Sequence, residues 1–423
     1  KFKMNNITEK DILKIGKKAK DASRKVSLLG TNLKNEIICS AAENLLNKKQ
    51  KLISENQKDI DENKTKLTSA TLDRLVLDSK RIDSICEGLI DISKLDDPIG
   101  KIIDKWSRPN GLKIEKVSIP LGVIGVIYES RPNVAADAAG LCLKSGNALI
   151  LRGGSESFHS SSMIIKIINE TLEKFKIPSG ALQNIPTKDR SAVGYMLKMD
   201  KYIDVLIPRG GRSLIERVID DSKIHVIRHL DGICHTYIEK SSKPNLSEKV
   251  TVNAKMRRPG ICGATETILI DKEILHSHLP QILMSLKKHK CEVRADKEIR
   301  KIDKSIKLAN DEDWHTEYLD KTVSIKTILA GVKEAVSHIN DYGSGHTDAI
   351  LSEDKDAVKY FLDNVDSGIV MHNTSTQFAD GGEFGMGAEI GISTSKVHAR
   401  GPVGVAQLTS FKYKVKGSGQ IRP

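Results

Sequence analysis

The chain has 423 residues and a formal net charge of +12, from 67 basic and 55 acidic residues. This length is enough for two or three domains. The content of 39% hydrophobic and 29% charged residues is typical of a globular protein. No apolar stretch approaches the roughly 18 residues of a membrane span, and the first residues lack the apolar segment of a signal peptide, so we expect a cytoplasmic protein.

Residues 5 to about 95 predict a series of helices, because apolar side chains recur three or four positions apart. One such stripe comprises Leu33, Ile37, Ala41 and Leu45. Pro98 and Gly100 end this helical region, and a short polar stretch follows. Polar and apolar residues then alternate over 112–117, which predicts an exposed strand.

From Pro120 the pattern changes to alternating strands and helices. We expect strands at 123–128, 148–151, 203–207, 224–227, 235–238, 267–270, 323–328 and 347–351, and helices at 133–144, 157–175 and 355–364. This alternation is typical of an α/β protein, with a parallel sheet covered on both faces. The tail from 407 alternates again and predicts an edge strand or one exchanged between chains.

The cysteines favour neither disulfides nor a metal site. The six are Cys39, Cys86, Cys142, Cys234, Cys262 and Cys291. None lies within ten residues of another and no Cys-x-x-Cys pair occurs, so a zinc or cluster site is not expected. Disulfides are rare in the cytoplasm. Cys39 and Cys86 fall on apolar helical stripes, where we expect them in the core.

Cys262 lies on a turn, because Pro259 and Gly260 break the helix that precedes it and an apolar strand follows. The guanidinium groups of Arg257 and Arg258 and nearby backbone N–H groups can lower the pKa of such a thiol and make it a nucleophile. The alternative is that this cysteine is a small buried hydrophobe, as single cysteines often are.

Three further loops carry candidate binding groups. The glycine-containing loops 152–155 and 208–213 each follow a strand and open a helix, where backbone N–H groups can approach a phosphate. Neither contains the Gly-x-Gly-x-x-Gly fingerprint, and a simple tight turn remains the alternative. His346 immediately precedes a predicted strand, and its alternative role is to bond a turn carbonyl.

Two strings, 120–127 and 146–152, resemble strands of the aldehyde dehydrogenase superfamily, and the order and spacing of the loops agree over nearly the whole chain. Within it the chain is more similar to the glutamate-5-semialdehyde dehydrogenase family, also called gamma-glutamyl phosphate reductases. The strings that carry this resemblance are 129–134, 206–211, 230–235, 253–262, 380–391 and 398–404. Gln377 departs from the pattern, since many members have Arg there, and this puts a substrate contact at that position in doubt.

The resemblance implies an aldehyde-dehydrogenase-like α/β fold, with two Rossmann-type domains and a small β arm for oligomerisation. The implied ranges are 1–104 and 121–229 for the cofactor-binding domain, 230–404 for the catalytic domain, and 105–120 with 405–423 for the arm. A homo-oligomer, either dimer or tetramer, is expected from this arm. Glutamate 5-kinase is a further candidate partner, because it would supply the labile acyl phosphate.

The implied reaction is the NADPH-dependent reduction of L-glutamyl 5-phosphate to L-glutamate 5-semialdehyde, with release of phosphate, in proline biosynthesis from glutamate. The Cys262 thiolate would attack the acyl phosphate, and the Cys262 N–H and the Asn133 side chain would stabilise the oxyanion. His229 stands approximately where hydrolytic members have a water-activating Glu. The absence of that Glu favours exchange of the acyl group with phosphate over hydrolysis. A shifted alignment with Asp231 as the base is the alternative.

The resemblance also assigns the cofactor site. Arg152, Gly153 and Ser155 fall where the superfamily contacts the adenosine ribose, and a basic residue with a small hydroxyl suits the 2′-phosphate of NADP(H). Gly210 and Gly211 would lie against the pyrophosphate. Glu317 matches the carboxylate that holds the nicotinamide ribose, and a surface carboxylate is the alternative for it.

Cationic groups are needed for the substrate's acyl phosphate and α-carboxylate. The candidates are Arg131, Arg257, Arg258 and Arg400, which the sequence does not assign individually. Thr374 and Ser375 are candidate donors by analogy with the superfamily's aldehyde-anchoring loop. No metal is expected at the site.

Two other functions were weighed. A coenzyme A-acylating aldehyde dehydrogenase would share Cys262 and the missing Glu, but the string 380–391 speaks against it. A nucleic-acid-binding protein on an inherited dehydrogenase scaffold would use the positive charge. The lysines are scattered beside acidic residues and only 4% of residues are aromatic, which argues against nucleic acid.

Overall fold

The structure is a computed structural model that describes residues 8–422. The chain forms two compact units. Unit 1 comprises the described residues up to Arg228, together with Gly385–Gly391 and the segment from Val403 onward, and unit 2 comprises His229–Phe384 and Ile392–Pro402. The assignment of cofactor binding, catalysis and oligomerisation to separate ranges stays a prediction.

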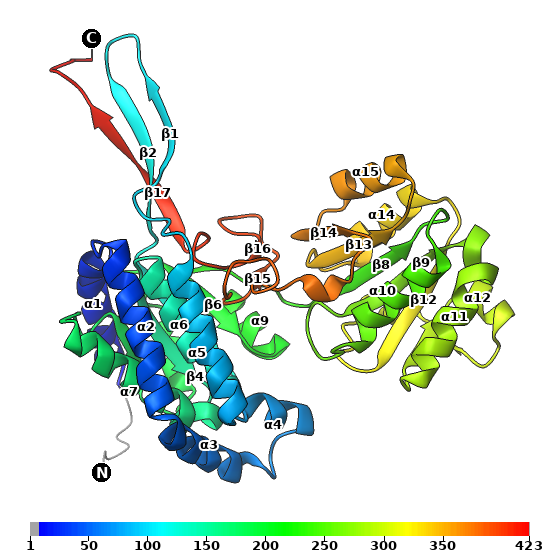
Figure 1. Cartoon of the computed structure of the whole chain (residues 1–423), viewed down its shortest axis with the longest axis horizontal. Coiled ribbons are helices and arrows are strands. Elements are labelled where there is room, and N and C mark those ends of the chain that lie inside the picture. Colours follow the sequence, from blue (N-terminus) through cyan, green and yellow to red (C-terminus); the bar gives the residue numbers. More distant parts are fainter. Residues whose placement is uncertain (1–7, 423) are drawn as a thin grey trace. The chain divides into compact units, whose positions relative to one another are not determined.

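Unit 1 contains the N-terminal helices, a parallel sheet and an antiparallel arm (Figure 1). Its helices are α1 (Glu9–Val26), α2 (Thr31–Asn47), α3 (Lys49–Asn63), α4 (Ser69–Leu75), α5 (Ser79–Lys94), α6 (Asn133–Lys144), η1 (Ser155–Ser157), α7 (Phe158–Lys174), α8 (Ser191–Met196) and α9 (Arg212–Asp221). Its strands are β1 (Ile102–Ser107), β2 (Lys113–Pro120), β3 (Val123–Tyr128), β4 (Ala148–Gly153), β5 (Leu182–Asn184), β6 (Val205–Arg209), β7 (His225–Val226) and β17 (Thr409–Lys416).

The five-stranded sheet of unit 1 is parallel, with the order β5-β4-β3-β6-β7. The central strand β3 is buried at every position, as its continuous apolar run predicts. Helix α1 packs on this sheet through Ile12 and Ala19. Helices α5 and α6 approach closely at Gly140, where an added Cβ would lie 2.6 Å from the Leu89 side chain. The helical region at the N-terminus thereby covers a conventional α/β core.

The arm is a three-stranded antiparallel sheet in the order β1-β2-β17, and Figure 1 shows it extending from the rest of unit 1. Strand β17 pairs with β2 of the same chain, from Thr409 opposite Pro120 to Lys416 opposite Lys113. The expectation of an edge strand at the tail is therefore confirmed. Strand β1 was not predicted, because all six of its residues are exposed and leave no burial pattern in the sequence.

Unit 2 is a second α/β layer structure (Figure 1). Its helices are α10 (Pro244–Met256), η2 (Lys272–Ile274), α11 (Leu275–Lys288), α12 (Lys297–Ile302), α13 (Asp311–Trp314), α14 (Val332–Tyr342), α15 (Lys355–Asn364) and η3 (Thr376–Phe378). Its strands are β8 (Cys234–Ile238), β9 (Thr265–Asp271), β10 (Glu292–Ala295), β11 (Lys307–Leu308), β12 (Thr322–Ile328), β13 (Thr347–Leu351), β14 (Ile369–His372), β15 (Ile392–Ser393) and β16 (Gly401–Pro402).

Seven of these strands form a parallel sheet in the order β11-β10-β12-β9-β8-β13-β14. Successive residues of β9 point to opposite faces: Ile268 and Ile270 pack in a core with α11 and α12, and Leu269 packs in a core with α14 and α15. Both faces are therefore covered, which confirms the predicted architecture. The short antiparallel pair β15-β16 completes this unit.

Of the two cysteines expected in the core, Cys86 is buried and Cys39 is exposed. The prediction for Cys39 was wrong because Ile37 and Ala41, not Cys39, face the core of α2. Cys39 lies two residues from Ile37, roughly 200° around the helix axis. Within residues 8–422, no helix combines the length and the hydropathy that a membrane crossing requires.

Candidate functional site

Four candidate residues of unit 2 lie in loops that precede four neighbouring strands. Glu317 precedes β12, Cys262 precedes β9, His229 precedes β8 and His346 precedes β13. The sheet order runs β12-β9-β8-β13, and all these strands are parallel. Loops that precede adjacent parallel strands emerge at the same edge of the sheet. This topology brings together residues that are far apart in the sequence.

The thiol of Cys262 and the imidazoles of His229 and His346 form one cluster. The cysteine sulfur and one ring nitrogen from each histidine lie within 4.8 Å of one another. The two rings meet edge to face with centroids 5.2 Å apart. His346 is fully buried, and Cys262 is half-buried against apolar residues that include Ile392. The residue at the position of the hydrolytic Glu is thus an imidazole beside the thiol, and the described part of the chain does not place Asp231 in this cluster.

Hydrogen bonds orient both imidazoles. His229 Nδ1 lies 2.7 Å from the carbonyl oxygen of Ile392, and because a carbonyl only accepts, this nitrogen carries the proton. His346 Nδ1 lies 2.9 Å from Thr347 Oγ1 and 3.6 Å from the Cys234 sulfur. Among the atoms of residues 8–422, His346 Nε2 is buried without a hydrogen-bond partner.

The cluster favours a thiolate beside an imidazolium. Burial by itself would raise the pKa of Cys262, but the charge of His346 and the closeness of both imidazoles lower it well below its usual value. For His346, burial acts to lower the pKa, yet the neighbouring Cys262 charge raises it above its usual value. The opposite shifts have one cause, since each charged form stabilises the other.

Gly232 holds the backbone of the cysteine loop at close range. A Cβ on Gly232 would lie 2.2 Å from the carbonyl oxygen of Cys262, so only glycine fits. The same residue donates its N–H to Glu317 Oε1 at 2.9 Å. The buried thiol of Cys234 donates to the Cys262 carbonyl at 3.1 Å. These contacts therefore hold together the loops that precede β8, β9 and β12, around Cys262.

A buried ion pair that the sequence reading missed supports this loop. Lys255 near the end of α10 pairs with Glu266 in β9, and both side chains are fully buried. Glu266 also accepts from the N–H of Leu319 at 3.2 Å, two residues after Glu317. Burial acts to raise the pKa of Glu266, and the neighbouring Lys255 ammonium opposes this rise. Two opposite charges that flank the Cys262 turn were the available signal in the sequence.

The substrate candidates of unit 2 differ in their availability. Arg257 and Arg258 are exposed, and Ser375 is buried where it caps η3 by accepting from the Gln377 N–H. Thr374 is half-buried beside it. Arg400 donates to the carboxylate and to the carbonyl of Asp366, each at 2.8 Å.

Gln377, the position that departs from the family pattern, is buried at the end of α10. Its side-chain amide donates to the carbonyl of Ala254 at 2.9 Å and to that of Arg258 at 3.4 Å. Its oxygen accepts from Arg257 at 3.4 Å. In this chain the residue joins η3 to the segment that leads into Cys262, which is a structural function.

In unit 1, the predicted residues lie after neighbouring strands. Arg131 and Asn133 follow β3, the Arg152 to Ser155 segment ends β4, and Gly210 and Gly211 follow β6. Because the order is β4-β3-β6, these loops share the carboxyl edge of the parallel sheet, where α/β folds bind ligands. The Asn133 amide donates to Asp137 at 2.9 Å, and burial raises the pKa of that carboxyl to about 6.

The predicted cofactor-binding side chains of unit 1 make polar contacts within that unit. Arg152 is only 5% exposed and donates to the carbonyls of Gly153, Lys188 and Asp189. Ser155 opens η1, and its hydroxyl lies 3.5 Å from a carboxylate oxygen of Glu156.

Gly210 and Gly211 are exposed at the start of α9. The Gly211 N–H donates to Glu129 at 2.8 Å, so a carboxylate lies at this helix N-terminus.

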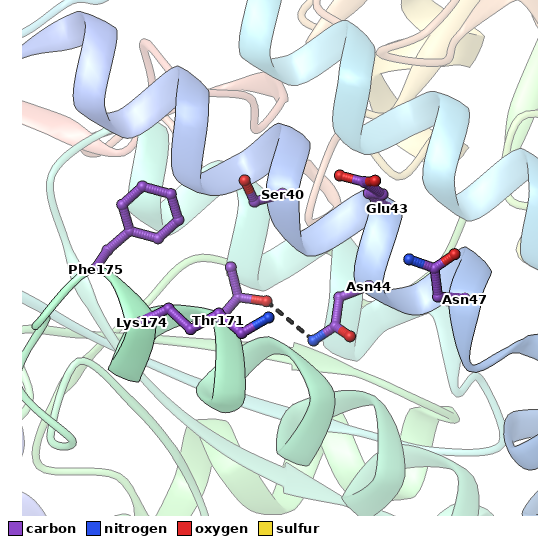
Figure 2. A pocket seen from close by; sticks show the side chains of 7 residues that line it. All are labelled: Ser40, Glu43, Asn44, Asn47, Thr171, Lys174 and Phe175. Carbon is purple, nitrogen blue, oxygen red and sulfur yellow. Dashed lines mark hydrogen bonds between the residues drawn. The ribbon is translucent and has the colours of Figure 1, made fainter.

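A groove elsewhere in unit 1 holds none of the predicted residues. It lies between α2 and α7, and Figure 2 shows its polar lining. The Asn44 amide crosses between the two helices to Thr171 Oγ1 at 3.2 Å and to the carbonyl of Ile167 at 3.1 Å. These contacts join the helices, and we assign the groove no catalytic role.

Comparison with known proteins places this geometry in a family. The aldehyde dehydrogenase family model matches residues 2–301. A gamma-glutamyl phosphate reductase of Rhodospirillum rubrum is 53% identical over 413 residues, covering 97% of this chain and 96% of that protein. The crystal structure of gamma-glutamyl phosphate reductase from Thermotoga maritima is 39% identical with a TM-score of 0.94, covering 97% of this chain and 100% of that one.

More distant structures share the fold alone. An acetylating aldehyde dehydrogenase from Geobacillus thermoglucosidasius has a TM-score of 0.69 at 15% identity, over 98% of each chain. The coenzyme A-acylating alternative therefore rests on fold similarity only. The family-model match spans more than half of the chain, and the similarity to the reductases extends over nearly all of it. The chain thus belongs to the aldehyde dehydrogenase family, in its gamma-glutamyl phosphate reductase branch.

Proposed function

We propose that the protein reduces L-glutamyl 5-phosphate to L-glutamate 5-semialdehyde with NADPH and releases phosphate, as a step of proline biosynthesis from glutamate. The observation that carries this proposal is the similarity, at half or more of all positions and over nearly full length, to proteins named for this reaction. The cluster of Cys262 with His229 and His346 supplies the chemistry that the reaction needs.

In the first half of the proposed reaction, the Cys262 thiolate attacks the acyl carbon. A carbon–sulfur bond forms, the bond from the acyl carbon to the phosphate oxygen breaks, and inorganic phosphate leaves. The product is a thioester on Cys262. The lowered pKa of this thiol supports the step, because the thiolate is the nucleophilic form at neutral pH.

The second half requires a hydride at the thioester carbon, which a nicotinamide cofactor held at Gly210 and Gly211 would supply. The resulting hemithioacetal collapses when the carbon–sulfur bond breaks, which yields the aldehyde and returns Cys262 to its thiolate form. We propose that His346 keeps the proton of the resting thiol on its own ring, at Nε2. This assignment uses the one buried nitrogen of His346 that has no other partner in the described structure.

His229 has a separate proposed role. Its Nδ1 proton is committed to Ile392, so in the neutral ring the Nε2 lone pair remains for the cysteine side. Protonated, the same ring would add a second hydrogen bond to the thiolate. No carboxylate base joins the cluster in the described residues, which supports transfer to phosphate over hydrolysis.

Membership of the family implies a nicotinamide cofactor, and NADP(H) is the specific proposal. Gly210 and Gly211 at the start of α9 are exposed and lack side chains, so backbone N–H groups there suit a diphosphate. The carboxylate of Glu129 now accepts from Gly211 and would have to yield to it. Arg152 and Ser155 are the proposed contacts for the 2′-phosphate, and Glu317 is the proposed contact for the nicotinamide ribose.

For the substrate, we propose the exposed Arg257 and Arg258 as the cations in unit 2 that are most available to the acyl phosphate and the α-carboxylate. Arg400 is held by Asp366 and is a weaker candidate. Arg131, Thr374 and Ser375 remain proposals from family similarity, as does Asn133 as a donor to the oxyanion together with the Cys262 N–H.

The proposed setting is the cytoplasm, where glutamate 5-kinase would deliver its labile product to this enzyme. We also propose a dimer or tetramer assembled through the arm. Its sheet exposes large apolar side chains, among them Ile103, Trp106 and Val415, and no strand within residues 8–422 pairs with the outer edge of β17.

The test is NADPH oxidation when the protein is supplied with a glutamate kinase, glutamate and ATP. Cys262→Ser should reduce turnover by at least about 1,000-fold, because a hydroxyl is far less acidic than a thiol and does not become an anion beside these imidazoles. Retention of more than about a tenth of the activity would remove Cys262 as the nucleophile. In the reverse direction, phosphate-dependent oxidation of the semialdehyde supports the proposal, and oxidation dependent on coenzyme A would support the acylating alternative.

A further inference from the structure

The Cys262 cluster has the composition of a binding site for a soft divalent cation. It presents one thiolate sulfur and two imidazole nitrogens, which are the ligand types that zinc prefers. Sites with three protein ligands leave the fourth position of the tetrahedron open to water or another small ligand. In the sequence the three residues lie in separate loops with no metal-ligand spacing, so no sequence motif indicates this set.

The distances are close to those of a coordinated ion. The three candidate ligand atoms all lie within 4.8 Å of one another. A tetrahedral zinc with a Zn–S bond of about 2.3 Å and Zn–N bonds of about 2.0 Å separates its ligand atoms by roughly 3.5 Å. The side chains would therefore draw together by up to roughly 1.3 Å, given these bond lengths.

The second observation is the support behind each imidazole. A metal-bound histidine usually donates its other N–H to a carbonyl or a similar acceptor, which fixes the ring. His229 does this through Nδ1 to the Ile392 carbonyl at 2.7 Å. His346 has Thr347 Oγ1 at 2.9 Å from its Nδ1. Its Nε2 is fully buried and, within residues 8–422, has no hydrogen-bond partner.

The neighbouring thiol of Cys234 is not part of the set. Its sulfur contacts Nδ1 of His346 and the carbonyl oxygen of Cys262, so it faces the other side of the His346 ring. The ligand set is thus defined as Cys262, His229 and His346.

We propose that Zn²⁺ binds reversibly to Cys262, His229 and His346 and switches the enzyme off. On binding, one Zn–S and two Zn–N bonds form, and a single proton leaves for the solvent. That count is the same whether the resting proton is on the thiol or on His346. The metal occupies the sulfur lone pair that attacks the acyl carbon, so the inhibition, unlike the binding, rests on the proposed function.

Binding is tested first, on the full-length apo protein with ZnCl₂ alone. We expect one ion per chain by calorimetry, with about one proton released when the titration is repeated in buffers of different ionisation enthalpy. Titration with Co²⁺ should give a thiolate-to-metal charge-transfer band. Cys262→Ala should abolish the band and weaken Zn²⁺ binding more than 100-fold, and His346→Gln or His229→Gln should each weaken it at least 10-fold.

Matched controls separate this site from unspecific thiol binding. Cys291→Ser and Cys39→Ser should retain one ion per chain and the same affinity. Because a single variant can misfold, alkylation of wild-type Cys262 with iodoacetamide before the titration provides a second route to the same loss. Equal Zn²⁺ affinity in wild type and in both the Cys262→Ala and alkylated forms would overturn the proposal.

Inhibition is tested separately on the active enzyme. Saturating Zn²⁺ should reduce NADPH oxidation at least 20-fold, EDTA should restore it, and Mg²⁺ at the same concentration should have no effect. Stoichiometric Zn²⁺ binding without any reductase activity would refute the proposed function and leave the metal site standing. Full activity at saturating Zn²⁺ would refute the switch while the proposed function stands.

Discussion

The Cα of Gly232 lies against the backbone of Cys262, so closely that an added Cβ would be 2.2 Å from the Cys262 carbonyl oxygen and 2.7 Å from its Cα. Gly232→Ala should therefore push the cysteine loop away without creating a cavity in either core. We expect at least a 10-fold loss of turnover, and a slower reaction of Cys262 with iodoacetamide, because the thiol leaves its two imidazoles. Steady-state kinetics and labelling followed by mass spectrometry measure both effects.

Gly88 supplies the control for this substitution. It lies inside α5, and an added Cβ there meets nothing within 4 Å. Gly88→Ala should preserve activity and add up to about 1 kcal/mol of stability, because alanine is the better helix former. Normal thiol labelling in Gly232→Ala would show that the close contact does not position Cys262.

The pH dependence of thiol alkylation follows from the shifted pKa values. Because the pKa of Cys262 is lowered, its thiolate fraction stays high as the pH falls through the usual cysteine range, and reactivity is lost only below the lowered pKa. His346→Gln removes the main charge that lowers this pKa, so the reactivity profile should move to higher pH. At pH 6 we expect the variant to react at least about 10-fold more slowly than wild type. Subtraction of the rate measured with Cys262→Ala removes the other thiols, and coincident profiles would refute the ion pair.

The Lys255–Glu266 pair should be tolerated in the core of unit 2 only while both charges are present. Removal of one partner leaves the other charge buried, which typically costs about 3–5 kcal/mol. We expect Glu266→Gln to lower the free energy of unfolding by an amount in this range. The double variant Lys255→Met with Glu266→Leu should recover most of it, since both charges are then absent. Chemical denaturation of the wild type, Lys255→Met, Glu266→Leu and this double variant forms the cycle, and additive losses would contradict the coupling.

The cofactor prediction concerns Arg152. The unmodified protein should have a higher kcat/KM with NADPH than with NADH, and Arg152→Glu should erase or reverse this preference, because a carboxylate repels the 2′-phosphate. Arg152 also bonds the carbonyls of Lys188 and Asp189, so the thermal midpoint must be measured together with the kinetics. A variant that loses activity equally with both cofactors would indicate a structural role only.

The arm prediction concerns strand β17. Deletion of 409–423 removes this strand and retains Leu408, whose carbonyl accepts from Asn147 at 2.8 Å inside unit 1. We expect the full-length chain to sediment as a dimer or tetramer at micromolar concentration and the truncated chain to sediment as a monomer or to lose solubility. Labelling of Cys262 in the truncated chain that remains in solution should equal that in the full-length chain. A truncated chain that keeps its full oligomeric state would place the assembly contacts elsewhere.

Much of the fold could be predicted because burial imposes a period on the sequence. Strand β3 is buried on both faces and its continuous apolar run defined it residue by residue. Strand β1 has no buried residue and left no signal. The prediction for Cys39 was wrong for a related reason. This apolar residue lies among the apolar residues of a helix, but its angular position on α2 places it outside the core.

The candidate site was harder to predict than the fold. Cys262 could be found because helix-breaking residues mark its turn, and His346 because it precedes a strand. The cluster itself could not be found, because it depends on the order β9-β8-β13, which local sequence patterns do not encode. The contacts of Gln377 and the Lys255–Glu266 pair likewise depend on which loops become neighbours.

The sheet edge beneath the cluster has a consequence for how the enzyme responds to distant change. Strand β8 is hydrogen-bonded to β9 on one side and to β13 on the other, and these strands pack on helices at both faces of the sheet. A cavity made deep in one strand, for example by Ile268→Ala, would alter the spacing of the loops that begin those strands. The alkylation rate of Cys262 would then report changes in packing throughout unit 2. A series of core variants could be compared by measuring this one rate.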